Sequence, residues 1–169
     1  MDQSQKKFWY AVYLKSKHEF KTEKKLREKD IEVFLPIIER IRQWKDRKKV
    51  VSFPLFPGYI FVNIRDDYDR MLSILKTPGV VRFLSLQGKS CPIPEEQIIS
   101  LKKLIENKEQ IDPHPYINEG EQVRITSGPL AGVEGTLIEK LNHNYLILSI
   151  DLIKQGAAVK IDAFDIEPV

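Results

Sequence analysis

A short proline-rich stretch divides the sequence into two parts with different patterns. Pro113 and Pro115 flank a single residue, and prolines spaced this closely disfavour helix and stiffen the chain, as in a spacer between domains. Helix and strand signals alternate before this stretch, whereas only strand signals follow it. We therefore predict a first domain at residues 1–108, a linker at residues 109–118 and a second domain at residues 119–169.

The net charge changes sign near the same place. Residues 1–50 contain 15 basic and 8 acidic side chains, residues 51–110 contain 8 and 7, and residues 111–169 contain 4 and 9. The first part of the chain therefore suits a polyanionic partner such as a nucleic acid, and the last part does not.

Composition excludes several classes of protein. With 42% hydrophobic and 30% charged residues the chain is typical of globular proteins. No apolar run approaches the roughly 20 residues of a membrane span, so we expect no membrane segment. A single cysteine, Cys91, excludes an internal disulfide and is typical of the cytoplasm. His18, His114 and His143 are scattered, and no spacing indicates a catalytic group, a metal or a cofactor, so we do not expect an enzyme.

The first part predicts an α+β sandwich, in which helices pack on one antiparallel sheet. Ser16 and Glu19 have the spacing of a capping box at the start of the first helix. The helices are expected at Glu19–Lys29, at Asp66–Lys76 and from Pro94 onward. The strands are expected at Phe8–Leu14, Ile31–Leu35, Ile37–Trp44, Lys48–Leu55, Tyr59–Ile64 and Val80–Leu84.

The second part predicts a small β-barrel, because several short strands in about 50 residues must roll up to hide their edges. Asn142–Asn144 is typical of a hairpin tip, since asparagine tolerates the left-handed conformation. The high content of β-branched residues favours strands, so we expect this domain to remain a β-barrel and not to convert to a helical form. The strands are expected at Gln122–Thr126, Thr136–Leu141, Tyr145–Asp151 and Ala157–Asp162.

The segment Ser127–Gly135 is the densest motif, with glycines at 128, 132 and 135. The segment lacks the Gly-Lys-Ser/Thr ending of a phosphate loop, so we do not expect that type of loop. Two interpretations remain: a plain turn of the barrel, or a loop that binds a partner. Together with Gly120 and Val123-Arg124-Ile125 it resembles the KOW motif. Four upstream segments are similar to the NGN domain of the NusG/RfaH superfamily: Trp9–Tyr13, Phe34–Pro36, Leu55–Val62 and Thr77–Phe83.

The resemblance covers nearly the whole chain in the family's order, and the lysine-rich first helix and acidic tail are similar to the specialised paralogues RfaH and UpxY. It implies an NGN sandwich followed by an SH3-like KOW barrel in a monomeric transcription elongation or antitermination factor. Such a factor binds RNA polymerase across the DNA cleft, from the β′ clamp helices to the β gate loop, and increases processivity. The KOW domain would recruit a small-subunit ribosomal protein or Rho.

The resemblance also implies which residues carry these contacts. Aromatic and apolar side chains on a helix-receiving surface would bind the clamp helices: Tyr13, Phe56, Tyr59, Phe61, Phe83, Ile98 and Leu101. Part of this set is also needed for the domain's own core, and Tyr13, Phe56 and Tyr59 match the exposed face of the family. Arg70-Met71-Leu72 aligns with the gate-loop contact.

Two further sets follow from the resemblance. A positive ridge beside the first helix would contact non-template or upstream DNA, although a solvated helix face is an equally good interpretation of any single lysine: Lys15, Lys17, His18, Lys21 and Lys25. The partner-binding loop of the KOW domain would comprise Gly128, Pro129, Leu130, Gly132 and Val133.

Two alternatives remain open from the residues. The hairpin Arg40–Lys49 carries six basic residues and Trp44, which suits an arm near DNA or RNA as well as a plain exposed hairpin. A ribosome- or RNA-associated KOW protein of translation is the second functional hypothesis. It is disfavoured because binding to ribosomal RNA needs a basic barrel.

Overall fold

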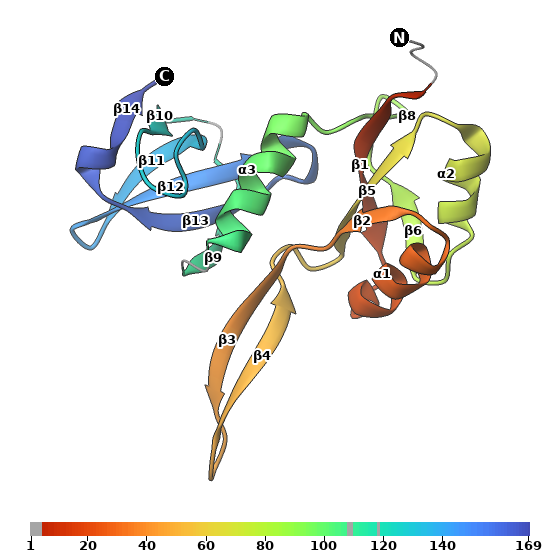
Figure 1. The fold of residues 1–169 in the computed structure, drawn as a ribbon, viewed down its shortest axis with the longest axis horizontal. Helices are drawn as coiled ribbons and strands as arrows, with labels where there is room; N and C mark the ends of the chain where they lie inside the picture. Colours follow the sequence, from red (N-terminus) through yellow and green to blue (C-terminus); the bar gives the residue numbers. More distant parts are fainter. Residues whose placement is uncertain (1–4, 108–109, 118) are drawn as a thin grey trace. The chain divides into compact units, whose positions relative to one another are not determined.

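The computed structural model describes residues 5–107, 110–117 and 119–169. It divides into two compact units. Figure 1 shows the fold as a ribbon coloured along the sequence. The first unit comprises the described part of residues 1–35 together with Phe56–Ile98. The second unit comprises Pro36–Leu55 together with the described part of residues 99–169. The predicted α+β class is confirmed, with three α-helices and largely antiparallel sheets in the described residues.

A four-stranded antiparallel sheet forms the first unit, in the order β2-β5-β1-β6. Its strands are β1 (Lys7–Leu14), β2 (Glu32–Phe34), β5 (Tyr59–Arg65) and β6 (Val80–Phe83). Helix α1 (Glu19–Glu28) packs on β2 and β5, and α2 (Tyr68–Leu75) packs on β6. Four consecutive residues of β1, 9–12, are buried, because both faces of this central strand are covered.

The start of α1 differs from the prediction. Lys17 takes the left-handed conformation, with a φ of 61°, and His18 rather than Ser16 is the N-cap residue of α1, without a side-chain hydrogen bond. The Glu19 carboxylate instead accepts a hydrogen bond from the backbone N–H of Gly58 at 2.9 Å. The predicted capping box between Ser16 and Glu19 is therefore wrong, because a distant loop binds the glutamate.

Short elements follow the four-stranded sheet. Strands β7 (Ser85–Leu86) and β8 (Lys89–Ser90) form a small hairpin that the sequence pattern did not predict, since two residues per strand are too few to show alternation. Helix α3 (Glu95–Glu106) begins after Pro94, as predicted. Its residues Ile98, Leu101 and Leu104 are buried at helical spacing.

The second unit contains the predicted hairpin, formed by β3 (Ile37–Gln43) and β4 (Lys48–Pro54). Figure 1 shows this hairpin as a two-stranded ribbon that extends to a narrow tip. The unit also contains a six-stranded antiparallel sheet in the order β14-β10-β11-β12-β13-β9. Its strands are β9 (Ile111–Pro115), β10 (Glu121–Ile125), β11 (Glu134–Lys140), β12 (His143–Ile150), β13 (Gln155–Ile161) and β14 (Ile166–Pro168).

The six-stranded sheet agrees with the predicted KOW barrel. Val123, Ile125, Leu146, Ile147 and Val159 are buried and supply its core. Single turns of 3-10 helix lie at η2 (Asp151–Ile153) and η3 (Ala163–Asp165). The β conformation of residues 121–168 is confirmed, and the absence of a second, helical state stays a prediction.

The predicted linker contains a strand. Residues 111–115 form β9, which pairs with β13 from Ile111↔Val159 to Pro115↔Gln155. Prolines are compatible with this role because β9 is an edge strand of the sheet, where a missing N–H breaks no ladder. Residues 109 and 118 of the predicted linker lie outside the described residues, and the domain boundary itself stays a prediction.

The hairpin tip of the second unit lies one residue earlier than predicted. Leu141 and Asn142 take the left-handed conformation, with φ of 52° and 62°. His143 and Asn144 already belong to β12, where they pair with Lys140 and Glu139. Two residues with positive φ match the right-handed twist of the strands that they join, so the shorter turn is favoured. In the part of the chain that the structure describes, no helix is long and apolar enough to cross a membrane.

Candidate functional site

An exposed row of side chains crosses three strands of the first unit. Tyr13 on β1 pairs with Tyr59 on β5 and with Arg82 on β6, so the three residues lie side by side on one face of the sheet. The two tyrosine rings have centroids 5.5 Å apart, and the Arg82 guanidinium lies 5.6 Å from the Tyr13 ring centroid. Tyr13 is 37% exposed, Tyr59 is half-buried and Arg82 is exposed. We call Tyr13, Tyr59 and Arg82 the aromatic row.

The loop before β5 holds this row in place. Gly58 has a φ of +86°, and a Cβ atom there would lie 3.3 Å from the Tyr13 ring, so the turn and the ring position both favour glycine. The Gly58 carbonyl accepts a hydrogen bond from Leu14 N at 2.8 Å, and its N–H donates to buried Glu19. The start of α1 therefore fixes the loop against β1.

Other predicted polymerase-binding residues lie in the core. Phe56, Phe61, Phe83, Ile98 and Leu101 are all between 0% and 7% exposed. Phe61 shares the face of Tyr59 but stacks on Phe34, with ring centroids 6.1 Å apart. Phe83 pairs with Val12 rather than Tyr13, so it lies on the opposite face and contacts Tyr10 edge-on. These five residues cannot contact a partner directly in this conformation, because other residues of the protein already cover their side chains.

The predicted gate-loop residues lie on α2. Arg70 is exposed and its guanidinium donates to the Lys29 carbonyl at 3.5 Å. Met71 and Leu72 are half-buried on the same helix. Arg70 is therefore the most solvent-exposed of the three predicted gate-loop residues.

The predicted basic ridge is exposed throughout. Lys15 and Lys17 lie in the turn before α1, and His18 caps the helix. Lys21 and Lys25 are four residues apart on α1 and so share a face. The structure thus places these five side chains in the turn before α1 and along α1 as far as its last turn, which contains Lys25, all in contact with solvent.

The predicted KOW loop divides into covered and exposed residues. Leu130 and Val133 are 7% and 1% exposed and belong to the core of the second unit. Gly128, Pro129 and Gly132 are exposed. The loop folds back on itself, with the Gly132 N–H donating to the Ile125 carbonyl and the Val133 N–H to the Leu130 carbonyl.

Phe164 is a candidate contact residue that the sequence pattern did not single out. It lies in η3 and is 94% exposed. The neighbouring Asp165 accepts a hydrogen bond from the Ser127 hydroxyl at 2.6 Å, and its carbonyl accepts one from Thr126 N at 2.8 Å. These bonds fasten η3 to the start of the KOW loop, so Phe164 extends the surface of that loop. Only its exposure, which depends on the tertiary fold, identifies it.

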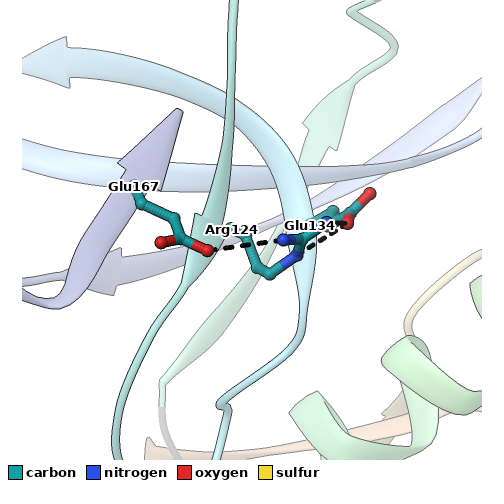
Figure 2. A network of polar contacts seen from close by, with 3 residues as sticks. All are labelled: Arg124, Glu134 and Glu167. Atoms are coloured by element: carbon teal, nitrogen blue, oxygen red, sulfur yellow. Dashed lines mark hydrogen bonds and ion pairs between the residues drawn. The ribbon is translucent and has the colours of Figure 1, made fainter. Parts of the chain in front are cut away.

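Carboxylates of the second unit pair with Arg124, the only arginine in the sequence beyond residue 110. Figure 2 shows Arg124 on β10 between Glu134 on β11 and Glu167 on β14. Arg124 Nε lies 2.8 Å from Glu134 Oε1, and its NH1 lies 3.3 Å from Glu167 Oε1. The hydrogen bond to Glu134 is the main reason that the pKa of Arg124 is raised. The network links three strands and leaves this guanidinium poorly available for a phosphate group.

A second cation of the same unit is also engaged. The Lys154 ammonium lies 4.5 Å from the ring centroid of Tyr116. The Tyr116 hydroxyl donates to Asp151 at 2.8 Å, which raises the pKa of Tyr116. Two of the four cations beyond residue 110 are therefore engaged within the unit. Within residues 5–107, 110–117 and 119–169 no group of three or more His, Cys, Asp or Glu side chains gathers in a way that could hold a metal ion.

Comparison with known proteins relates this architecture to one family. The model of the family described as transcription termination factor nusG matches residues 7–102. The transcription termination/antitermination protein NusG of Staphylococcus aureus (strain Mu50) is 33% identical over 176 residues, which cover 95% of each chain. The protein of the same name from Helicobacter pylori (strain 26695) is 27% identical, covering 95% of this chain and 98% of that protein.

A solved structure shares the fold. It is described as domain interaction in Thermotoga maritima NusG, with a TM-score of 0.57 and 24% identity over 98% of this chain and 99% of that one. The family model covers more than half of this chain, and the staphylococcal relative spans nearly all of it. The chain belongs to the NusG family.

Proposed function

We propose that this chain is a transcription elongation and antitermination factor that binds RNA polymerase through the aromatic row. The observation that carries the proposal is the near full-length similarity to proteins named for transcription termination and antitermination. The row supplies a fitting surface, because partly exposed tyrosine and arginine are the residue types enriched at interface hot spots. The factor would span the DNA cleft from the β′ clamp helices to the β gate loop, with Arg70 at the second contact, and so raise processivity.

We also propose that the KOW domain recruits a second protein, either a small-subunit ribosomal protein or Rho. Exposed Phe164 beside Gly128 and Pro129 offers an apolar contact on this loop. Residues 111–169 carry 4 basic and 9 acidic side chains, which favours a basic partner over RNA. Arg124 pairs with Glu134 and Glu167 and is therefore poorly available to RNA phosphates, which also favours a protein partner over RNA.

Truncation of the aromatic row is expected to weaken polymerase binding. Replacement of Tyr13 or Arg82 by alanine removes a hot-spot side chain, which typically costs about 2 kcal/mol, or roughly 30-fold in Kd. The measurement is capture of core RNA polymerase by the full-length protein, with folding checked by circular dichroism. Phe164→Ala is the matched control, and it should bind polymerase normally while losing the KOW partner.

The same capture experiment separates the two functional hypotheses. Polymerase and ribosomal subunits are offered in parallel, and polymerase is expected to be retained. Folded Tyr13→Ala and Arg82→Ala proteins that bind polymerase as well as the unchanged chain would contradict the proposed surface. Retention of ribosomal subunits alone would contradict the proposed function.

The basic ridge is expected to contact DNA phosphates. Joint replacement of Lys15, Lys21 and Lys25 by glutamine should flatten the salt dependence of binding to a polymerase–DNA complex. Each lost phosphate contact reduces the slope of log K against log salt by about 0.9 for duplex DNA, because fewer counterions are released. Lys140→Gln with Lys160→Gln, two exposed lysines of the second unit, is the control. An unchanged slope in the triple variant would show that these lysines are only solvated.

A further inference from the structure

The β3–β4 hairpin has two chemically different faces. Directly paired residues of an antiparallel ladder share a face, and successive pairs alternate between faces. Ile41↔Val50 therefore lies on one face and Arg42↔Lys49 on the other. Phe53 lies on the second face, because the Arg42 guanidinium is 4.7 Å from its ring centroid. The first face is thus apolar at its centre, and the second combines cations with an aromatic ring.

The apolar face of the hairpin borders a groove, and the base of the hairpin has partners within the second unit. Ile41 and Val50 line a groove of about 620 Å³ together with Ile105 of α3 and Ile111 of β9. Arg40 forms an ion pair with Asp112 at 2.5 Å and also donates to the Ile111 carbonyl. The base of the hairpin is therefore anchored, whereas the residues from 41 to 50 are all exposed.

The tip presents an aromatic ring among cations. Trp44 N donates to the Arg47 carbonyl at 2.7 Å, which closes the turn, and the Trp44 side chain is 55% exposed. Trp44 directly follows and Arg47 directly precedes the last pair of the ladder, Gln43↔Lys48, so both residues lie at the tip between the two strands. Among the described residues none of the following five exposed cations lies within 4.0 Å of a carboxylate oxygen: Arg42, Lys45, Arg47, Lys48 and Lys49.

We propose that this tip, defined as Arg42, Trp44, Arg47 and Lys49, binds single-stranded nucleic acid. An unpaired base stacks on the exposed indole, and the flanking phosphates contact the cations. A duplex offers the same phosphates but keeps its bases stacked on each other, so it cannot use Trp44. An exposed tryptophan at the tip of a two-stranded ribbon, in a segment whose five exposed cations form no ion pair with the described residues, is the observation that carries the proposal. The proposal is independent of the aromatic row and of polymerase binding.

The chain allows a direct optical test. It has two tryptophans, of which Trp9 is 6% exposed and Trp44 is 55% exposed. Titration of the full-length protein with oligo-dT, oligo-U or duplex DNA should quench the Trp44 emission with single strands and leave it unchanged with the duplex. The comparison of oligo-dT with oligo-U shows whether DNA or RNA is preferred.

Variants separate stacking from charge. Trp44→Ala is expected to weaken binding of a labelled oligo-dT about tenfold, as typical for loss of one stacked base. Arg42→Gln with Lys49→Gln should weaken binding and flatten its salt dependence. Tyr68→Ala, an aromatic residue 77% exposed on α2, and the Lys140→Gln, Lys160→Gln pair are controls that should leave binding unchanged.

Three outcomes would overturn the proposal. One is equal affinity of the folded Trp44→Ala protein and the unchanged chain. Another is equal affinity for duplex and single strands with unquenched emission, which would show phosphate contact alone. The third is loss of quenching in the Lys15, Lys21 and Lys25 triple variant, which would place the nucleic acid on α1. Failure of polymerase binding in any variant does not affect these readouts.

Discussion

Replacement of Gly135 by alanine is expected to unfold the six-stranded sheet while the first unit stays folded. A Cβ atom at this position would lie 2.5 Å from the Ile147 carbonyl oxygen and 2.7 Å from the side chain of Leu146, which is fully buried. Neither neighbour can move freely, so overpacking should cost about 3 kcal/mol or more. A domain of about 50 residues has only about 5 kcal/mol of stability, so this cost removes most of it.

The effect is measured by amide NMR of the full-length protein. Signals of residues 119–169 should lose their dispersion, and those of the first unit should keep theirs. Gly128→Ala is the matched control from the same motif, because its φ of +80° is strained for alanine but no atom lies within 4 Å of the added Cβ. It should cost about 1 kcal/mol. A Gly135→Ala protein as stable as the control would contradict the close approach of β11 to β12.

Phe56→Ala is expected to destabilise the protein rather than to abolish polymerase binding selectively. The Phe56 ring is 1% exposed, and truncation of a buried phenylalanine typically costs about 3–5 kcal/mol. This loss should lower the Tm by more than about 10 °C in thermal unfolding followed by circular dichroism. The reason is the cavity that the missing ring leaves in a close-packed core.

Two variants frame this experiment. Phe20→Ala removes the same side chain from a position that is 45% exposed, and it should change the stability by less than about 1 kcal/mol. Phe56→Leu keeps most of the volume and should recover much of the loss. A Phe56→Ala protein that is stable but no longer binds polymerase would contradict the role of Phe56 in the core and would indicate that Phe56 contacts polymerase directly.

The contrast between buried and exposed aromatic residues explains which site residues could be predicted from sequence. Tyr59 and Phe61 are two residues apart on β5 and share a face, and both are aromatic. One lies in the exposed row and the other stacks on Phe34. Strand alternation predicts that Tyr59 and Phe61 share a face of β5. It does not predict that another segment of the chain covers Phe61 and leaves Tyr59 partly exposed. Exposure therefore selects Tyr13 and Tyr59 from the predicted set, and pairing with Tyr13 adds Arg82.

In the second unit, too, the sequence predicts the loop but not which of its residues are exposed. Glycine and proline spacing predicted the loop after β10, and the structure has a loop there. Leu130 and Val133 nevertheless face the core, while Phe164, from a segment distant in sequence, supplies an exposed aromatic side chain. The hydrogen bond between Ser127 and Asp165 spans 38 residues of sequence, so no local pattern could reveal it.

Local physical chemistry was enough to predict much of this protein from its sequence. β-Branched alternation, turn residues and proline positions identify most strands and helices, and the charge asymmetry distinguishes a basic front from an acidic tail. Only the tertiary structure decided the partner of Glu19, the burial of Phe56 and Phe83, and the pairing of β9 with β13. These features depend on segments distant in sequence, such as Glu19 and Gly58, which are 39 positions apart. Packing and long-range hydrogen bonds, which a local pattern does not encode, determine them.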